Sequence, residues 1–71
     1  MARPIQIANR VRELREQHNA MTQAQLGKII GVTRQTVAAI ENRQYSPSLE
    51  SAFRIARAFE RSIDEVFFWE E

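Results

Sequence analysis

The 71-residue sequence contains no cysteine and only one histidine, His18. Without cysteine the chain can form neither a disulfide nor a thiolate metal site, and a lone histidine lacks the further ligands that zinc requires. We therefore expect no metal and no cofactor. No apolar run approaches the roughly 20 residues of a membrane span, and no basic-then-apolar signal segment opens the chain. We expect a cytoplasmic protein without membrane contact.

The usual constellations of catalysis are missing as well. The sequence holds no set of nucleophile, histidine and carboxylate, and it has no glycine-rich phosphate loop. An enzyme is therefore not expected.

A chain of this length forms one domain, over residues 1–71. Such a small domain buries only about 60% of its unfolded surface, so association with another chain is one way to gain stability.

Charge is distributed unevenly along the chain, although its net value is only +1. Residues 1–45 carry seven basic and three acidic side chains, and residues 46–71 carry three basic and six acidic ones. A basic half suits a surface that faces phosphate, and an acidic half suits solvent or a protein partner. The alternative is a mixed surface whose asymmetry has no functional meaning.

The segment 22–42 predicts two short helices joined by a tight turn. Gly31 follows the first apolar-periodic stretch and can adopt the left-handed conformation that ends a helix. Thr33 can then cap the next helix through its side-chain oxygen. Two helices crossing at a short glycine-containing turn are typical of a helix-turn-helix motif. The apolar residues that define the two inward faces are Leu26, Ile29 and Ile30 in the first helix and Val37 and Ile40 in the second.

The second of these helices begins with three hydrogen-bonding side chains, Arg34, Gln35 and Thr36. None of them is a carboxylate, so none repels phosphate. Arginine can pair with two acceptors on guanine, and glutamine can pair with the edge of adenine. These residue types fit a helix N-terminus inserted into the DNA major groove. An ordinary surface helix with a polar start is the alternative.

Capping signals recur along the chain and predict five helices, which indicates an all-α domain. The caps are Asn9, Thr22, Thr33, Ser48 and Ser62, with a full capping box at Thr22–Gln25 and at Ser62–Glu65. The expected helices outside the motif cover about residues 9–18, 48–60 and 62–67. On the fourth helix, one apolar stripe comprises Leu49, Ala52, Ile55, Ala56 and Phe59.

The two ends of the chain are expected to differ from the helical centre. Alternating Ile5 and Ile7 suit a short edge strand, and a disordered start is the alternative. Phe67, Phe68 and Trp69 cannot all face one small core if the chain is extended. We expect residues 67–71 to form a dimerisation tail, with Phe68 and Trp69 in the interface and the N-terminal strand beside them. Folding of all three aromatics over the monomer's own core is the alternative.

Several ordered segments together resemble a known family. They are Arg10–Arg15, Thr22–Leu26, Gly31–Val37, Ile40–Asn42, Tyr45–Leu49, Ile55–Ala56 and Ile63–Phe67. Each is weak alone, but their order and spacing resemble the Xre or Cro/repressor family of prokaryotic and phage helix-turn-helix regulators. The resemblance implies a five-helix fold like that of lambda repressor, and the terminal strand segments leave room for a short β-ribbon.

The resemblance also implies roles for individual side chains. Arg34, Gln35, Thr36 and Ala39 would face the bases, where Ala39 offers only apolar contact. Gln23, Thr33, Asn42, Arg43 and Tyr45 would contact phosphate. Arg15 and Glu41 would form a buried ion pair. Arg43 stands where the family often has glycine, so either Asn42 or Arg43 is expected to adopt a left-handed conformation.

From these observations we expect a sequence-specific DNA-binding transcriptional regulator, and a repressor rather than an activator. It would bind a pseudo-palindromic operator in double-stranded DNA as a homodimer, without a small-molecule ligand. The alternative is the antitoxin, or another protein-interaction module, of a toxin–antitoxin pair that also regulates its own operon.

Overall fold

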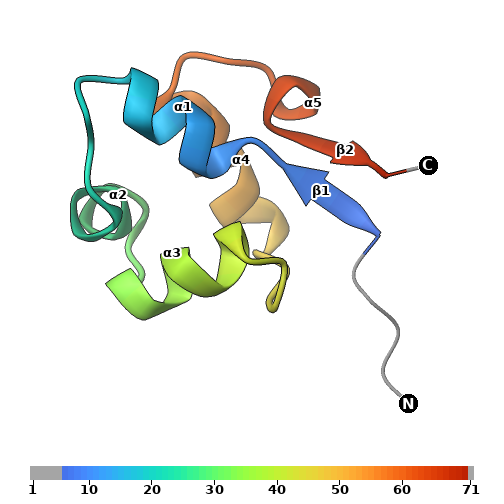
Figure 1. The fold of residues 1–71 in the computed structure, drawn as a ribbon, viewed down its shortest axis with the longest axis horizontal. Helices are drawn as coiled ribbons and strands as arrows, with labels where there is room; N and C mark the ends of the chain where they lie inside the picture. The colour runs from blue at the N-terminus through green and yellow to red at the C-terminus, as the bar shows by residue number, and fades with distance from the viewer. Residues whose placement is uncertain (1–5, 71) are drawn as a thin grey trace.

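The computed structural model describes residues 6–70, and within them it contains five α-helices and one two-stranded antiparallel sheet. The expected all-α domain with a short terminal β-ribbon is confirmed. The helices surround a common core, and the ribbon projects on the side of the molecule away from α2 (Figure 1). In chain order the elements are β1 (Ile7–Asn9), α1 (Val11–Gln17), α2 (Gln23–Ile30), α3 (Arg34–Glu41), α4 (Leu49–Ala58), α5 (Ile63–Val66) and β2 (Phe67–Trp69).

The predicted capping residues begin the helices, with one difference in the first. Thr22, Thr33 and Ser48 each accept a hydrogen bond from the backbone three residues on, which satisfies an otherwise unpaired amide at the helix start. Asn9 lies one residue outside the cap of α1, which is Arg10. Its side-chain oxygen nevertheless accepts from the amide of Val11 at 3.1 Å.

The turn between α2 and α3 depends on both glycines of the chain. Gly31 has a φ of 82°, in the left-handed region that side chains disfavour, and its amide closes α2 by donating to the carbonyl of Gly27. A side chain on Gly27 would place its Cβ 2.7 Å from the carbonyl oxygen of Val32. The turn therefore packs directly on the backbone of α2, and this contact fixes the direction of α3 relative to α2.

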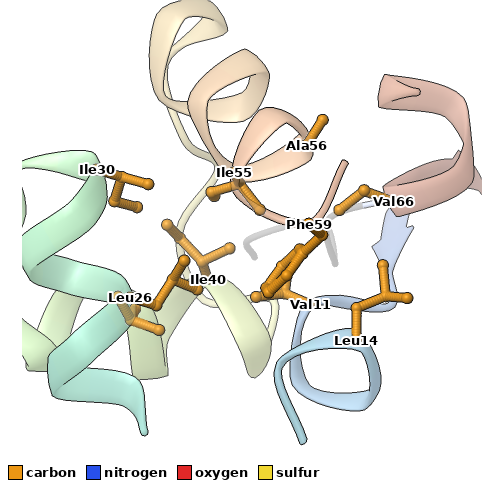
Figure 2. Packing of buried hydrophobic residues seen from close by; sticks show 10 residues of the cluster. Val11, Leu14, Leu26, Ile30, Ile40, Ile55, Ala56, Phe59 and Val66 are labelled. Atoms are coloured by element: carbon orange, nitrogen blue, oxygen red, sulfur yellow. The ribbon is translucent and has the colours of Figure 1, made fainter. Parts of the chain in front are cut away.

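The core collects apolar side chains from all five helices (Figure 2). Two residues expected in it lie outside. Ile29 is 54% exposed and Leu49 is 72% exposed, so both predictions are wrong. Helical spacing identified the apolar stripe of α4, but Leu49 is the first residue of that helix and stays exposed. The buried members of the core are Val11, Leu14, Leu26, Ile30, Val37, Ile40, Ile55, Ala56, Phe59 and Val66.

The ribbon joins the two ends of the described chain. Ile7 lies opposite Trp69, Ala8 opposite Phe68, and Asn9 opposite Phe67. The predicted strand began at Ile5, which lies outside the described residues, and the observed strand runs from Ile7 to Asn9. The last helix is shorter than expected because Phe67 has already turned to extended backbone, with φ −120° and ψ 137°.

Candidate nucleic-acid interface

The N-terminus of α3 faces solvent. The side chain of Thr33 accepts a hydrogen bond from the amide of Thr36 at 3.1 Å, and the two hydroxyl groups lie 3.1 Å apart. Arg34 and Gln35 follow the cap and are exposed, while Thr36 is half-buried. The opposite side of α3 is anchored in the core by Val37 and Ile40. The helix therefore presents two exposed polar side chains, one guanidinium and one carboxamide, on a fixed frame.

Five of the predicted DNA-facing residues surround one shallow hollow of about 280 Å³. Tyr45, which comes from the loop after α3, lies there beside residues from the start and middle of that helix. Ala39 contributes a methyl group to the hollow. The residues lining the hollow are Thr33, Gln35, Thr36, Ala39 and Tyr45. The fold thus gathers on one face residues that are up to 12 positions apart in the chain.

A chain of hydrogen bonds connects the surface of α3 to the interior. Arg34 Nη1 donates to Gln23 Oε1 at 3.3 Å, and Gln23 Nε2 donates to Glu41 Oε1 at 3.0 Å. Glu41 in turn accepts from Arg15 Nε at 2.7 Å and from Arg15 Nη2 at 3.2 Å. The carboxylate of Glu41 therefore sets the orientation of the Gln23 side-chain amide, and the oxygen of that amide faces the exposed guanidinium of Arg34.

The ion pair between Arg15 and Glu41 lies inside the protein. Their side chains are 11% and 4% exposed, and Arg15 Nη1 also donates to the backbone carbonyl of Met21 at 2.8 Å. The hydrogen bond to Glu41 raises the pKa of Arg15 above its ordinary value, against the opposing effect of burial. Glu41 is the only acidic residue between positions 22 and 42. Its pairing with Arg15 neutralises the one carboxylate of this segment.

The loop after α3 carries Asn42 and Arg43. Asn42 is exposed and has an ordinary φ of −87°, whereas Arg43 has a φ of 60°. Arg43 is therefore the residue in the left-handed conformation. Its guanidinium forms an ion pair with Glu70, which follows the end of β2. Sequence reasoning did not find this pair, because only the ribbon register brings the tail to the loop.

The two aromatic residues expected at a dimer interface have different surroundings. Phe68 is half-buried, and the guanidinium of Arg10 lies 4.5 Å from the centre of its ring, within the range of a cation–π contact. Trp69 is 68% exposed. Phe68 and Trp69 are neighbours in one strand and therefore face opposite sides of the ribbon.

Within residues 6–70, no three histidine, cysteine or acidic side chains gather as they would around a metal ion. No helix in this range has both the length and the apolar character needed to cross a membrane. Every buried side-chain nitrogen and oxygen in the range has a hydrogen-bond partner.

Comparison with known proteins agrees with this geometry. Residues 11–66 match the helix-turn-helix family, and the match includes all five helices. The chain is 49% identical over 63 residues to the HTH-type transcriptional regulator YgzD of Bacillus subtilis, covering 89% of this chain and 94% of that protein.

Two further relatives come from different groups of organisms. The HTH-type transcriptional regulator MJ0272 of Methanocaldococcus jannaschii is 44% identical over 63 residues, with 89% of this chain and 94% of that protein covered. The antitoxin HipB of Escherichia coli K12 is 35% identical over 60 residues, with 84% of this chain and 67% of HipB covered.

Proposed function

Because the chain belongs to the Xre, or Cro/repressor-type, family of helix-turn-helix transcriptional regulators, we propose that it represses transcription by binding a specific operator as a homodimer. The observation that carries the proposal is the exposed start of α3, where Arg34 and Gln35 point away from a helix fixed in the core. In the proposed complex this end of α3 enters the major groove, where base pairs differ in their donors and acceptors.

Arg34 and Gln35 determine the sequence in this account. Arg34 keeps one N–H on Gln23 and has further N–H groups for the two acceptors of a guanine. Gln35 can donate and accept at the edge of an adenine. Thr36 and Ala39 contact the neighbouring bases, and Ala39 can meet only an apolar group such as the methyl of thymine.

A second set of residues fixes the position of the helix on DNA. Phosphate contacts carry no sequence information, but they set register and orientation. Gln23 is suited to this role because its amide lies beside Arg34 at the start of α2. Tyr45 lies on the far side of the same surface, in the hollow with Gln35. The proposed phosphate contacts are Gln23, Thr33, Asn42, Arg43 and Tyr45.

The operator of a two-fold dimer has two half-sites. Recognition helices in such dimers enter successive major grooves about 34–36 Å apart, which corresponds to about one turn of DNA. Selection of bound sequences from random DNA tests this proposal. We expect a pseudo-palindrome with half-site centres about 10 base pairs apart. A pool without any enriched sequence would contradict specific recognition, and a single unrepeated site would contradict the dimeric operator.

A second candidate function is that of an antitoxin that also regulates its own operon. The similarity to HipB, which is named as an antitoxin, favours it, as does the exposed aromatic and acidic end of the chain, Trp69 and Glu70. Co-expression with the product of a neighbouring gene tests it. The antitoxin function predicts that this product arrests growth when expressed alone and that the present chain relieves the arrest by direct binding.

A further inference from the structure

The turn at the end of α3 has a geometry that glycine usually provides. The amide of Arg43 donates to the carbonyl of Ile40 at 3.1 Å, and the amide of Gln44 donates to the carbonyl of Ala39 at 2.9 Å. These two bonds form a Schellman motif, in which the residue after the helix cap is left-handed and is usually glycine. Arg43 occupies that position with a φ of 60°. Because a side chain disfavours this conformation, contacts from other elements have a larger share in keeping the turn closed.

Asn9 of β1 supplies such a contact. Its side-chain Nδ2 donates to the carbonyl of Ile40 at 3.0 Å, across 31 positions in the chain. A backbone carbonyl has two lone pairs, so Ile40 accepts from Asn9 and from the amide of Arg43 together. The side-chain oxygen of Asn9 accepts from the amide of Val11. One carboxamide thus joins β1, the start of α1 and the end of α3, which lies toward the ribbon (Figure 1).

The other strand of the ribbon reaches the same turn. Glu70, which follows β2, pairs with the guanidinium of Arg43, and the amide of Glu70 donates to the carbonyl of Gln6 beside β1. Asn9 itself lies opposite Phe67 in the ribbon. The ribbon therefore holds the backbone of the turn through Asn9 and the Arg43 side chain through Glu70.

We infer that Asn9 is a positioning residue for DNA binding, an inference that rests on the proposed contacts of Asn42 and Arg43 with phosphate. Asn9 itself does not touch DNA. By holding the carbonyl of Ile40 it fixes the turn that carries Asn42 and Arg43, and thus the place where these two side chains meet the DNA backbone. Phosphate contacts carry no sequence information. Loss of the Asn9 contact should therefore weaken binding to all DNA alike and leave the preference for the operator unchanged.

Asn9→Ser separates the two hydrogen bonds of the carboxamide. A serine hydroxyl can still accept from the amide two residues on, but its side chain is one bond shorter and does not reach the carbonyl of Ile40. Amide hydrogen exchange of the free protein measures the effect on the turn. We expect the amides of Arg43 and Gln44 to exchange about tenfold faster in this variant, the effect of losing one hydrogen bond. The amide of Gly31, which closes α2, should exchange as in the wild type.

DNA affinity at several salt concentrations measures the effect on binding. Asn9→Ser should bind the operator and unrelated DNA more weakly by a similar factor, up to about tenfold, which corresponds to one hydrogen bond to a charged group. Its plot of log K against log salt concentration should be shallower than that of the wild type, by less than the roughly one unit that a complete phosphate contact contributes. Ser62→Ala is the control, since it removes the polar side chain that caps α5. It should leave affinity and slope unchanged.

Asn9→Asp provides a second variant of nearly the same shape, in case Asn9→Ser does not fold. Its carboxylate can accept from the amide of Val11, but at neutral pH it has no donor for the carbonyl of Ile40. Asn19→Asp is the control for charge, because it makes the same change at an exposed residue of the loop after α1. We expect faster exchange at Arg43 and a shallower salt dependence in Asn9→Asp alone.

Three results would overturn the inference. Unchanged exchange at Arg43 in both Asn9 variants would show that Asn9 does not hold the turn. Faster exchange with unchanged DNA binding would show that the contact serves the fold alone. A loss confined to the operator, with an unchanged salt dependence, would place the effect at the bases. If only the role of Asn9 is wrong, the wild type still prefers its operator; if the proposed function is wrong, the wild type itself prefers no sequence.

Discussion

Arg15 and Glu41 form a two-point ion pair that joins α1 to the end of α3, with nitrogen–oxygen distances of 2.7 and 3.2 Å. The same carboxylate holds Gln23, whose oxygen accepts from Arg34. One buried group thus contributes to the stability of the fold and to the position of a side chain proposed to contact bases. The first prediction follows from this double role.

Glu41→Ala should lower the free energy of unfolding by about 3–5 kcal/mol, because it leaves the guanidinium of Arg15 buried without its partner. Urea denaturation followed by circular dichroism measures this change. The exposed pair of Arg12 and Glu16 provides a control, since Arg12→Ala should cost about 0.5 kcal/mol or less. Equal losses in the two variants would contradict the structural role of the buried pair.

Glu70 should weaken DNA binding, because it neutralises Arg43, which is proposed to contact phosphate. Glu70→Gln should therefore raise the affinity for DNA at low salt. It should also steepen the plot of log K against log salt concentration, by less than the roughly one unit that a complete additional phosphate contact would add. Fluorescence anisotropy at several salt concentrations measures both quantities.

Glu13→Gln is the control for that prediction, because it changes the net charge equally at an exposed residue of α1. It should produce a smaller rise in affinity and leave the slope almost unchanged. Identical binding by the two variants would show that net charge, and not the contact between Glu70 and Arg43, sets the affinity.

The stability of the start of α5 should depend on pH, because the carboxyl group of Glu65 titrates there. The backbone N–H and the hydroxyl of Ser62 donate to its carboxylate, both at 2.9 Å, and they lower the pKa of Glu65. A lowered pKa in the folded state stabilises that state above the unfolded pKa of about 4.3, and this contribution is lost as the pH falls through the folded pKa. Loosening of α5 is therefore expected only in acid.

A carbon-detected NMR titration of the Glu65 carboxyl group measures this pKa. Its midpoint should lie below the ordinary glutamate range, and Ser62→Ala should raise it part of the way back by removing the hydroxyl donor. A midpoint in the ordinary range, unchanged by Ser62→Ala, would contradict the hydrogen bonds at this helix start.

The parts of the fold that sequence reasoning predicted are those decided by local chemistry. Thr22 and Thr33 cap their helices, and Gly31 takes the left-handed conformation, because each depends on neighbouring backbone alone. The pair of Arg15 and Glu41 was implied by resemblance to a family and is present in the structure.

The parts that it missed depend on tertiary contacts. Helical spacing placed Ile29 and Leu49 in the core, but no neighbouring element covers either side chain. The pairing of Arg43 with Glu70 joins residues 27 positions apart and requires the register of the ribbon. Burial at the edge of a helix and contacts between chain ends are set by packing, which periodicity within one segment does not reveal.

Competition binding with Arg34→Ala/Gln35→Ala tests the central claim, recognition of bases by the start of α3, most directly. Both side chains are exposed, so the double variant should unfold at nearly the same denaturant concentration as the wild type. The account predicts that its affinity for the selected operator falls almost to its affinity for unrelated DNA, while the latter changes little. Retention of the wild-type preference for the operator would contradict the account.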